Sequence, residues 1–554
     1  MLLPKVIGID LDNTIINYNE AFKYTAKKLN ILSKDFSAEN ISSANGLSTK
    51  DLIKKHVLSQ IGGKYNWESL QGQVYGNFIR HARIFPGVSN FLFHCNWRGI
   101  KVFVISHKTK FGHHDKYKTS LRESAVNFLE QNNLLSGAYG LSKSSIFFFE
   151  TRKDKVSKIA ELGCDYFIDD LPEVFLEPNF PKKTKKIIFN LQEQSASENS
   201  FSTWHEINKY FFDDIKLTDV SAYVESGLNE EVKTVKKIKG RANSNIFKIE
   251  MQTGQKYAGK LYPDSTFDQR ERLEKETKAY RFMNSHDIDS VAKIIWFDIN
   301  LDFGLYEWFT GSEIKEVTDE KIIDAVLFIQ SLSDLSKCAN HQNFDLASAA
   351  CLSGKMIEDQ IWDRFRKTDE YSHFYPALKL FLDKKLFPAC EKILESSKKL
   401  WPGDFHKKLN KVNQVLSPSD FGFHNAIQTK DGLKFIDFEY FGWDDPVKLT
   451  CDFILHPGML LSEGQKNLWL NNVKNIFSEN HSFQNRLNAS YCLYGLCWCL
   501  IQLNIFYKKN GKTNKNLVPK EQEKLEKKQA EKLTNSKRLL KHLNETYKYG
   551  LPYE

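Results

Sequence analysis

Residues 417–445 read SPSDFGFHNAIQTKDGLKFIDFEYFGWDD and hold three residues of the kinds that a phosphoryl-transfer site needs. Asp420 precedes Asn425 by five residues, and Asp437 follows after the turn dipeptide Asp431-Gly432 and a short apolar run. Moving a phosphoryl group from ATP to a hydroxyl requires one carboxylate beside the hydroxyl and two oxygen ligands that hold Mg²⁺ on the phosphates. We therefore predict that Asp420 is the catalytic carboxylate and that Asn425 and Asp437 bind Mg²⁺.

This spacing resembles the aminoglycoside phosphotransferase and choline kinase-like family, which are small-molecule kinases with a protein-kinase-like fold of two lobes. The resemblance implies ATP as the phosphoryl donor, with Lys260 on a strand as the nucleotide-phosphate lysine and Glu276 on the next helix as its partner. The family commonly has a histidine two residues before the catalytic aspartate, where this chain has Pro418. We expect this departure to affect the geometry of the loop more than its chemistry.

A second group of acidic residues follows strands predicted in the first part of the chain. The apolar strand over residues 5–9 leads into Asp10-Leu11-Asp12-Asn13-Thr14. Alternation along an extended chain points Asp10 and Asp12 to the same side, so both carboxylates can reach one phosphate. Another predicted strand ends in the adjacent pair Asp169 and Asp170. Two such acids repel each other unless a cation lies between them, which predicts a Mg²⁺ site.

Together with Ser106, which ends a buried strand over residues 101–105, these segments resemble the haloacid dehalogenase-like (HAD) hydrolases. The resemblance implies a doubly wound parallel sheet with its site at the carboxyl ends of the strands. It implies that Asp10 attacks the substrate phosphate and that Asp12 acts first as general acid and then as general base. The residues implied as Mg²⁺ ligands are Asp10, Asp12, Asp169 and Asp170.

The same resemblance implies two groups that bind the substrate phosphate. Ser106 is one of them, and a lysine in the stretch RKDKVSKIAELG is the other. Our choice is Lys155, and Lys153 and Lys158 remain as alternatives.

The order of the motifs predicts two domains in the 554 residues. We expect an α/β HAD-like domain over residues 1–215, with an inserted helical cap at about residues 17–83 that closes over a small substrate. Residues 216–554 are expected to form an α+β kinase domain that ends in a basic helix.

The composition indicates the class of protein, its cellular compartment and its partners. Hydrophobic residues make up 41% and charged residues 27%, as in ordinary globular proteins. We find no apolar run that approaches the ~20 residues needed to cross a bilayer. The nine cysteines show neither zinc spacing nor a disulfide framework, so we expect a cytoplasmic protein. The net charge of +9 comes largely from the lysine-rich tail, and we expect no nucleic acid partner. The tail leaves homo-oligomerisation open.

These features predict a bifunctional enzyme. One site would be a Mg²⁺-dependent phosphatase for a small phosphorylated metabolite. The other would be an ATP-dependent kinase for a hydroxyl of a small molecule, with a sugar or polysaccharide precursor as the expected acceptor. Two alternatives remain: a protein-directed kinase and phosphatase regulator, or a nucleotide-binding protein with one degenerate site. The sequence leaves open the identity of both substrates and whether both sites are active.

Overall fold

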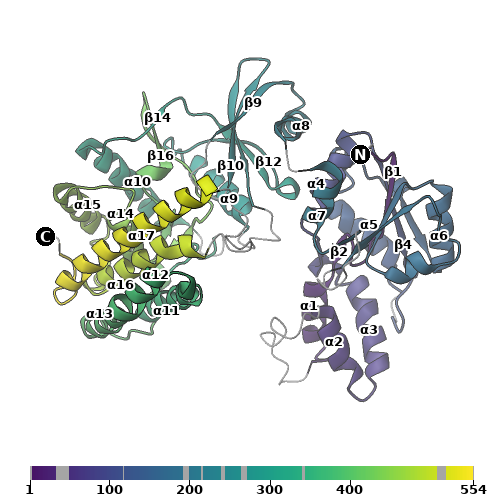
Figure 1. The fold of residues 1–554 in the computed structure, drawn as a ribbon, viewed down its shortest axis with the longest axis horizontal. Helices are drawn as coiled ribbons and strands as arrows, with labels where there is room; N and C mark the ends of the chain where they lie inside the picture. The colour runs from purple at the N-terminus through teal and green to yellow at the C-terminus, as the bar shows by residue number, and fades with distance from the viewer. Residues whose placement is uncertain are drawn as a thin grey trace. The chain divides into compact units, whose positions relative to one another are not determined.

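The computed structural model describes residues 3–32, 49–115, 118–190, 199–213, 216–238, 244–263, 271–339, 344–507 and 519–552 (Figure 1). The chain divides into two compact units. The first comprises Met1–Gln269 and Trp296–Leu305, and the second comprises Arg270–Ile295 and Tyr306–Glu554. The domain boundary predicted near residue 215 lies outside the described residues.

The first unit contains a six-stranded sheet in which every pairing is parallel. Its strand order is β5-β4-β1-β6-β7-β8, so the first strand of the chain lies inside the sheet. The parallel sheet that the sequence predicted is therefore present. The strands are β1 (Val6–Ile9), β4 (Lys101–His107), β5 (Ile146–Phe149), β6 (Tyr166–Asp169), β7 (Lys185–Phe189) and β8 (Ser200–Phe201).

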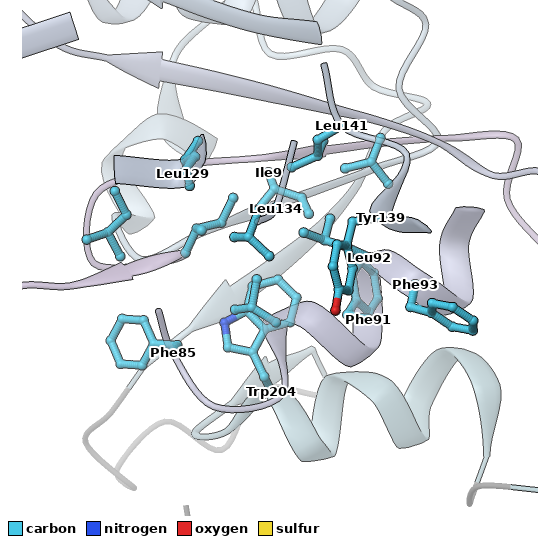
Figure 2. Close-up of a cluster of buried hydrophobic side chains, with 14 of the residues drawn as sticks. Ile9, Phe85, Phe91, Leu92, Phe93, Leu129, Leu134, Tyr139, Leu141 and Trp204 are labelled. Atoms are coloured by element: carbon cyan, nitrogen blue, oxygen red, sulfur yellow. The ribbon is translucent and has the colours of Figure 1, made fainter. Parts of the chain in front are cut away.

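Both faces of this sheet are buried, because successive residues of one strand belong to different hydrophobic clusters. Ile168 of β6 packs in one cluster and its neighbour Phe167 in the other. Helices α4 (Val88–Trp97) and α5 (Leu121–Gln131) supply the first cluster, which Figure 2 shows around Ile9 and Trp204. Helix α6 (Arg152–Glu161) supplies the second cluster. Helices therefore cover both faces of this parallel sheet.

A helical segment interrupts the chain between two short strands. Strands β2 (Ile16–Asn17) and β3 (Arg83–Ile84) pair in antiparallel fashion, so the two ends of the segment lie next to each other. The helical cap predicted at about residues 17–83 stays a prediction. Its helices are α1 (Asn19–Lys28), α2 (Thr49–Leu58) and α3 (Gly63–Tyr75).

A five-stranded sheet with the order β12-β13-β11-β10-β9 follows along the chain. Tyr223, on α8 (Leu217–Leu228), lies with its ring centroid 5.7 Å from that of Phe303. Residues of this sheet share one buried cluster with the parallel sheet, which explains why the first unit extends beyond residue 215. The strands are β9 (Val232–Ile238), β10 (Asn245–Met251), β11 (Lys256–Leu261), β12 (Ile294–Asp298) and β13 (Phe303–Glu307).

The second unit is mainly helical and carries two small sheets. One sheet has the order β14-β16-β17, and the other pairs β15 with β18. These strands are β14 (Ser312–Glu313), β15 (Val415–Ser417), β16 (Ala426–Thr429), β17 (Gly432–Phe435) and β18 (Gly442–Asp444). The helices are α9 (Arg272–Asn284), α10 (Asp319–Cys338), α11 (Gly354–Glu370), α12 (Pro376–Phe381), α13 (Phe387–Leu400), α14 (Pro446–Leu455), α15 (Glu463–Ile476), α16 (Phe483–Leu503) and α17 (Pro519–Thr546).

The expectation that no apolar run approaches the length of a membrane span is wrong for one stretch among the described residues, which is long and apolar enough to cross a bilayer. It is Phe483–Phe506, in which an 18-residue window has a mean hydropathy of 1.4 and is 83% buried inside the protein. Such burial is typical of a core helix, because a helix of a globular unit that is covered on all sides has no polar face.

Candidate active sites

The acidic residues of the first unit meet at one edge of the parallel sheet. Asp10 follows β1 directly, and its backbone N–H donates to the carbonyl of Ile168 at 2.8 Å. Asp169 ends β6, which lies beside β1. Carboxylate oxygens of Asp10, Asp169 and Asp170 lie within 4.8 Å of one another. The structure thus brings together acids that are about 160 positions apart in sequence, because parallel strands end at the same edge of a sheet.

Lys155 links two of these acids. Its Nζ donates to Oδ1 of Asp10 at 2.5 Å and to Oδ2 of Asp169 at 2.7 Å. Burial alone would lower the pKa of Lys155, but the two carboxylates raise it above its ordinary value. Of the three candidate lysines, Lys155 is the one that reaches the acids. Lys158 instead pairs with Glu161, and Lys153 is exposed.

Helix α6 begins so that Lys155 falls in its first turns. Thr151 is the N-cap, and its Oγ1 accepts from the backbone N–H of Asp154 at 3.1 Å. This cap satisfies one of the free N–H groups at the helix start. It also places Lys155 on the inward face, where the side chain is only 1% exposed.

Ser106 occupies the predicted phosphate-binding position near the end of β4, a neighbour of β1. The side chain is 1% exposed, and its Oγ has no hydrogen-bond partner among the described residues. A buried hydroxyl without a partner costs roughly 1–3 kcal/mol. A ligand oxygen would remove that cost, so the residue fits a phosphate-binding role.

Lys108 is a site residue that the sequence reasoning missed. Its Nζ donates to both carboxylate oxygens of Asp12, at 2.9 Å each, and the side chain is buried. The hydroxyl of Tyr18 donates to Oδ1 of the same carboxylate at 2.6 Å. The available signal was the spacing from Ser106, since residues two apart on a strand point to the same side.

Negative charge is concentrated at this edge. Burial raises the pKa of Asp10 well above its ordinary value, and the neighbouring carboxylates add to the increase. Burial and the charge of Asp169 raise the pKa of Asp170 to about 7. Hard oxygen donors with an excess of negative charge suit Mg²⁺, which would relieve the repulsion. The predicted ligands among these acids therefore fit the ion.

The helical segment sends side chains toward the same acids. Burial alone would lower the pKa of Lys50, on α2, but the Tyr75 phenol and the charges of Asp170 and Asp12 raise it. The Tyr75 ring, on α3, has its centroid 4.6 Å from Nζ of Lys108. The segment thus supplies polar groups close to the acids.

In the second unit, the loop after β15 carries Asp420. Ser419 adopts a left-handed conformation with φ of +67°, and its Oγ donates to the carbonyl of Ser348 at 3.0 Å. The Oγ of Ser417 accepts from the backbone N–H of Ser419 at 3.1 Å. The two serines around Pro418 therefore hold the loop that leads into Asp420.

Asn425 closes this loop and meets the hairpin that bears Asp437. Its Nδ2 donates to the carbonyl of Asp420 at 2.9 Å, which leaves its amide oxygen for a cation. Its own carbonyl accepts from the N–H of Ile436 at 3.0 Å. Because Ala426 pairs with Phe435 across the hairpin, Asn425 lies opposite Ile436 at its open end, and Asp437 is the residue that follows Ile436. Two oxygen donors in this position fit Mg²⁺.

Asp437 belongs to a further acidic group. Its carboxylate and those of Glu276 and Glu439 offer oxygens within 4.8 Å of one another. Glu276 also accepts from the backbone N–H of Phe438 at 3.1 Å, and Glu439 forms a buried ion pair with Arg272. Glu276 therefore anchors the chain just beyond Asp437, a contact that the sequence did not predict.

Lys260 lies on β11 in the first unit, opposite Ile246 of β10. Its side chain is buried, and Nζ lies 4.8 Å from the ring centroid of Tyr262. Glu276 belongs to the second unit, and the predicted pairing of Lys260 with Glu276 stays a prediction.

Two histidines beside Asp420 were also missed. Nε2 of His424 lies 2.9 Å from Oδ1 of Asp420, and the ring of His456 stacks on that of His424 with centroids 4.0 Å apart. Burial would raise the pKa of Asp420, but the hydrogen bond from His424 and the nearby positive charges lower it below its ordinary value. The carboxylate is therefore ionised at neutral pH.

No protein-family model matches the sequence, and no curated protein matches it. Solved structures do resemble part of the chain. A spectinomycin phosphotransferase, solved with ADP and spectinomycin, is 10% identical, with a TM-score of 0.43; the match covers 60% of this chain and 99% of that one. The amicoumacin kinase hAmiN, solved with AMP-PNP and Ca²⁺, is 11% identical, with a TM-score of 0.40. The match covers 63% of this chain and 98% of that one. A Plasmodium vivax ethanolamine kinase is 14% identical, with a TM-score of 0.37. The match covers 64% of this chain and 93% of that one.

Proposed function

We propose that the protein is an ATP-dependent kinase that phosphorylates a hydroxyl of a small molecule. The observation that carries this proposal is the hydrogen-bonded loop in which Asn425 donates to the carbonyl of Asp420 and lies across the hairpin from Ile436, the residue before Asp437. The carboxylate of Asp420 can therefore accept a proton from an alcohol, and the side-chain oxygens of Asn425 and Asp437 can bind a cation.

The residues divide the kinase reaction between them. The substrate hydroxyl attacks the γ-phosphorus of ATP, its proton passes to Asp420, and the bond from that phosphorus to ADP breaks. The Asp420 side chain is 42% exposed, so a substrate can reach it. Asn425 and Asp437 would hold Mg²⁺, which neutralises phosphate charge when bound. Lys260, with Glu276 as its predicted partner, would hold the α- and β-phosphates.

An acceptor screen tests this function. The unaltered protein is incubated with MgATP and a panel of hexoses, pentoses, glycerol and ethanolamine, and ADP release is measured. We expect at least one acceptor to raise ADP release, and Asp420→Asn to remove the increase. Acceptor-independent binding of ADP without any turnover would instead favour a nucleotide-binding protein.

We further propose that the first unit is a Mg²⁺-dependent phosphohydrolase acting on a small phosphorylated metabolite, which makes the enzyme bifunctional. The supporting observation is the convergence of Asp10, Asp12, Lys155 and the unpartnered hydroxyl of Ser106 at one edge of the sheet. We expect the side chains of Lys50 and Tyr75, which lie close to the acids, to favour a small substrate over a polypeptide.

In this reaction Asp10 attacks the substrate phosphorus and forms an aspartyl-phosphate. Asp12 gives a proton to the departing alcohol and then takes one from a water molecule, which attacks the same phosphorus and frees Asp10. Lys155 and Ser106 would hold the phosphate oxygens. Asp10, Asp169 and Asp170, with Asp12 beside them, would hold Mg²⁺, which lowers the repulsion between phosphate and carboxylates when bound.

Trapping the covalent intermediate tests the phosphatase proposal. With a panel of sugar phosphates, we expect phosphate release and a phosphoenzyme that hydroxylamine cleaves, since an acyl phosphate reacts with that reagent. Asp10→Asn should abolish both. Phosphate release that persists in Asp10→Asn would contradict the covalent mechanism.

A kinase joined to a phosphatase is suited to consecutive steps on one metabolite, with phosphate removed at one position and added at another. A sugar or polysaccharide precursor is the acceptor class that we propose. A product of the phosphatase reaction that serves as kinase acceptor would support the pairing, whereas unrelated substrates would contradict it.

A further inference from the structure

We propose that His424 is the positioning residue of the kinase site: it fixes the carboxylate of Asp420 so that one oxygen faces the imidazole and the other faces the acceptor hydroxyl. This inference rests on the proposed kinase function and deepens it. Nε2 of His424 lies 2.9 Å from Oδ1 of Asp420, which is hydrogen-bond distance.

The carboxylate needs such a partner because it is open to solvent. The Asp420 side chain is 42% exposed, whereas that of His424 is 14% exposed. An exposed aspartate turns freely about its two side-chain bonds, so its oxygens have no fixed direction of their own. A hydrogen bond from a largely buried ring removes that freedom, and reactive geometry is sensitive to displacements of about 1 Å.

The assignment of the donor follows from the surroundings of the ring. Nδ1 of His424 is buried and has no hydrogen-bond partner among the described residues. Nε2 is the ring nitrogen that faces an acceptor, so the neutral ring gains a hydrogen bond only with its proton on that nitrogen. His424 therefore donates from Nε2 to Asp420, and Oδ2 of Asp420 remains to accept the proton of the substrate hydroxyl.

The ring of His424 is packed against the ring of His456 and lies close to Gly422. The His456 ring stacks on it at 4.0 Å and 13°, and Trp498 meets His456 edge-on at 4.7 Å. Trp498 is fixed in turn, because its Nε1 donates to Asp452 at 2.8 Å. A side chain at Gly422 would come within 2.9 Å of Nδ1 of His424, so a glycine is needed at this position. The orientation of His424 is thus set by packing rather than by the loop alone.

A metal site is the competing interpretation, because Asp420, His424 and His456 offer ligand atoms within 4.8 Å of one another. An imidazole binds a metal through a lone pair that lies in the plane of its ring. The two rings are stacked and nearly parallel, so a single ion cannot lie in both ring planes. The stacking therefore favours the positioning role.

Variants of His424 test the inference. His424→Phe keeps a ring for stacking but has no donor, and His424→Gln keeps an N–H at a similar reach. ADP release is measured with MgATP alone, where water is the acceptor, and with the panel compound that gives the fastest release. We expect His424→Phe to lower kcat by about 10-fold to 100-fold, with the KM for ATP changed less than about twofold. His424→Gln should recover at least about a third of the unaltered rate.

The matched control is His481→Phe, which makes the same substitution at an exposed histidine outside the site. Its kcat and its affinity for ADP should equal those of the unaltered protein. Calorimetric ADP affinity and the unfolding temperature of each variant separate a lost donor from a damaged fold.

The outcomes distinguish the inference from the function on which it rests. Unchanged kcat in His424→Phe, while Asp420→Asn is inactive, overturns the positioning role alone. Equal losses in His424→Phe and His424→Gln also overturn it, because packing rather than the hydrogen bond would then matter. Full activity in Asp420→Asn, or no ADP release by the unaltered protein in either assay, overturns the proposed kinase and the inference with it.

Discussion

The two acidic sites differ in how they control their carboxylates. In the first unit, Asp169 is fully buried and Asp10 nearly so, and Lys155 bridges the two. In the second unit, Asp420 is 42% exposed and its neighbour is an imidazole. A nucleophile that forms a covalent bond with phosphorus gains from a rigid, dry setting with fixed charges. A base that must meet a separate acceptor has to remain open, and it needs only its direction fixed.

The largest effects on activity are expected when the proposed reacting carboxylates of the two sites are substituted. Asp10→Asn should lower phosphate release by about 1000-fold or more and leave ADP release unchanged, and Asp420→Asn should do the reverse. Parallel assays on the two variants and a double variant measure this independence. Loss of both activities in one single variant would show that the sites act as a unit.

Removal of the bridging lysine should reduce stability strongly in the first unit. Lys155→Met leaves two buried carboxylates without their partner, which costs about 3–5 kcal/mol of unfolding free energy. Urea unfolding monitored by circular dichroism measures the loss. Lys158→Met is the matched control, because its ion pair with Glu161 is at the surface and should be worth under about 1 kcal/mol. Equal losses in both variants would contradict the bridging role.

A smaller effect is expected at Lys108, which acts through the orientation of Asp12. Lys108→Met should lower kcat for phosphate release by about 10-fold to 100-fold, because the acid and base group loses two of its hydrogen bonds. Lys108→Arg can donate to both oxygens and should retain more activity. Steady-state kinetics on one sugar phosphate measures both, and an unchanged kcat in Lys108→Met would exclude the role.

The smallest expected effect is the contribution of Asp170 to the pH dependence of the unfolding free energy. The pKa of Asp170 is raised to about 7 in the folded protein, so between about pH 4 and pH 7 the folded state binds more protons than the unfolded state. Without Mg²⁺, this group therefore makes stability fall as the pH rises through that range. Unfolding temperatures measured from pH 4.5 to 7.5 test the slope, which Asp170→Asn or added Mg²⁺ should flatten. A slope unaffected by either change would contradict the assignment.

Several features of the fold and the sites could be predicted from local patterns. The apolar runs before Asp10 and Asp169 predicted strands, and parallel strands place their last residues at one edge. The turn Asp431-Gly432 predicted the hairpin, at whose open end Asn425 lies opposite Ile436, the residue before Asp437. These predictions succeeded because alternation, strand length and turn chemistry depend on neighbouring residues.

Other features could not be predicted in this way. Lys108 and His424 looked like ordinary polar residues, because their importance lies in what they contact. The extent of the first unit depends on Tyr223 and Phe303, which join two sheets in one core. Such contacts link segments that no short pattern relates.

The sequence by itself determined which residues we propose for phosphoryl-transfer chemistry and on which strands and loops they lie, because spacing and side-chain chemistry are local properties. Only the tertiary structure decided which lysine bridges Asp10 and Asp169, which hydroxyl is left without a partner, and which imidazole faces Asp420. The physical reason is that burial and hydrogen bonding are set by groups that folding brings together from distant parts of the chain.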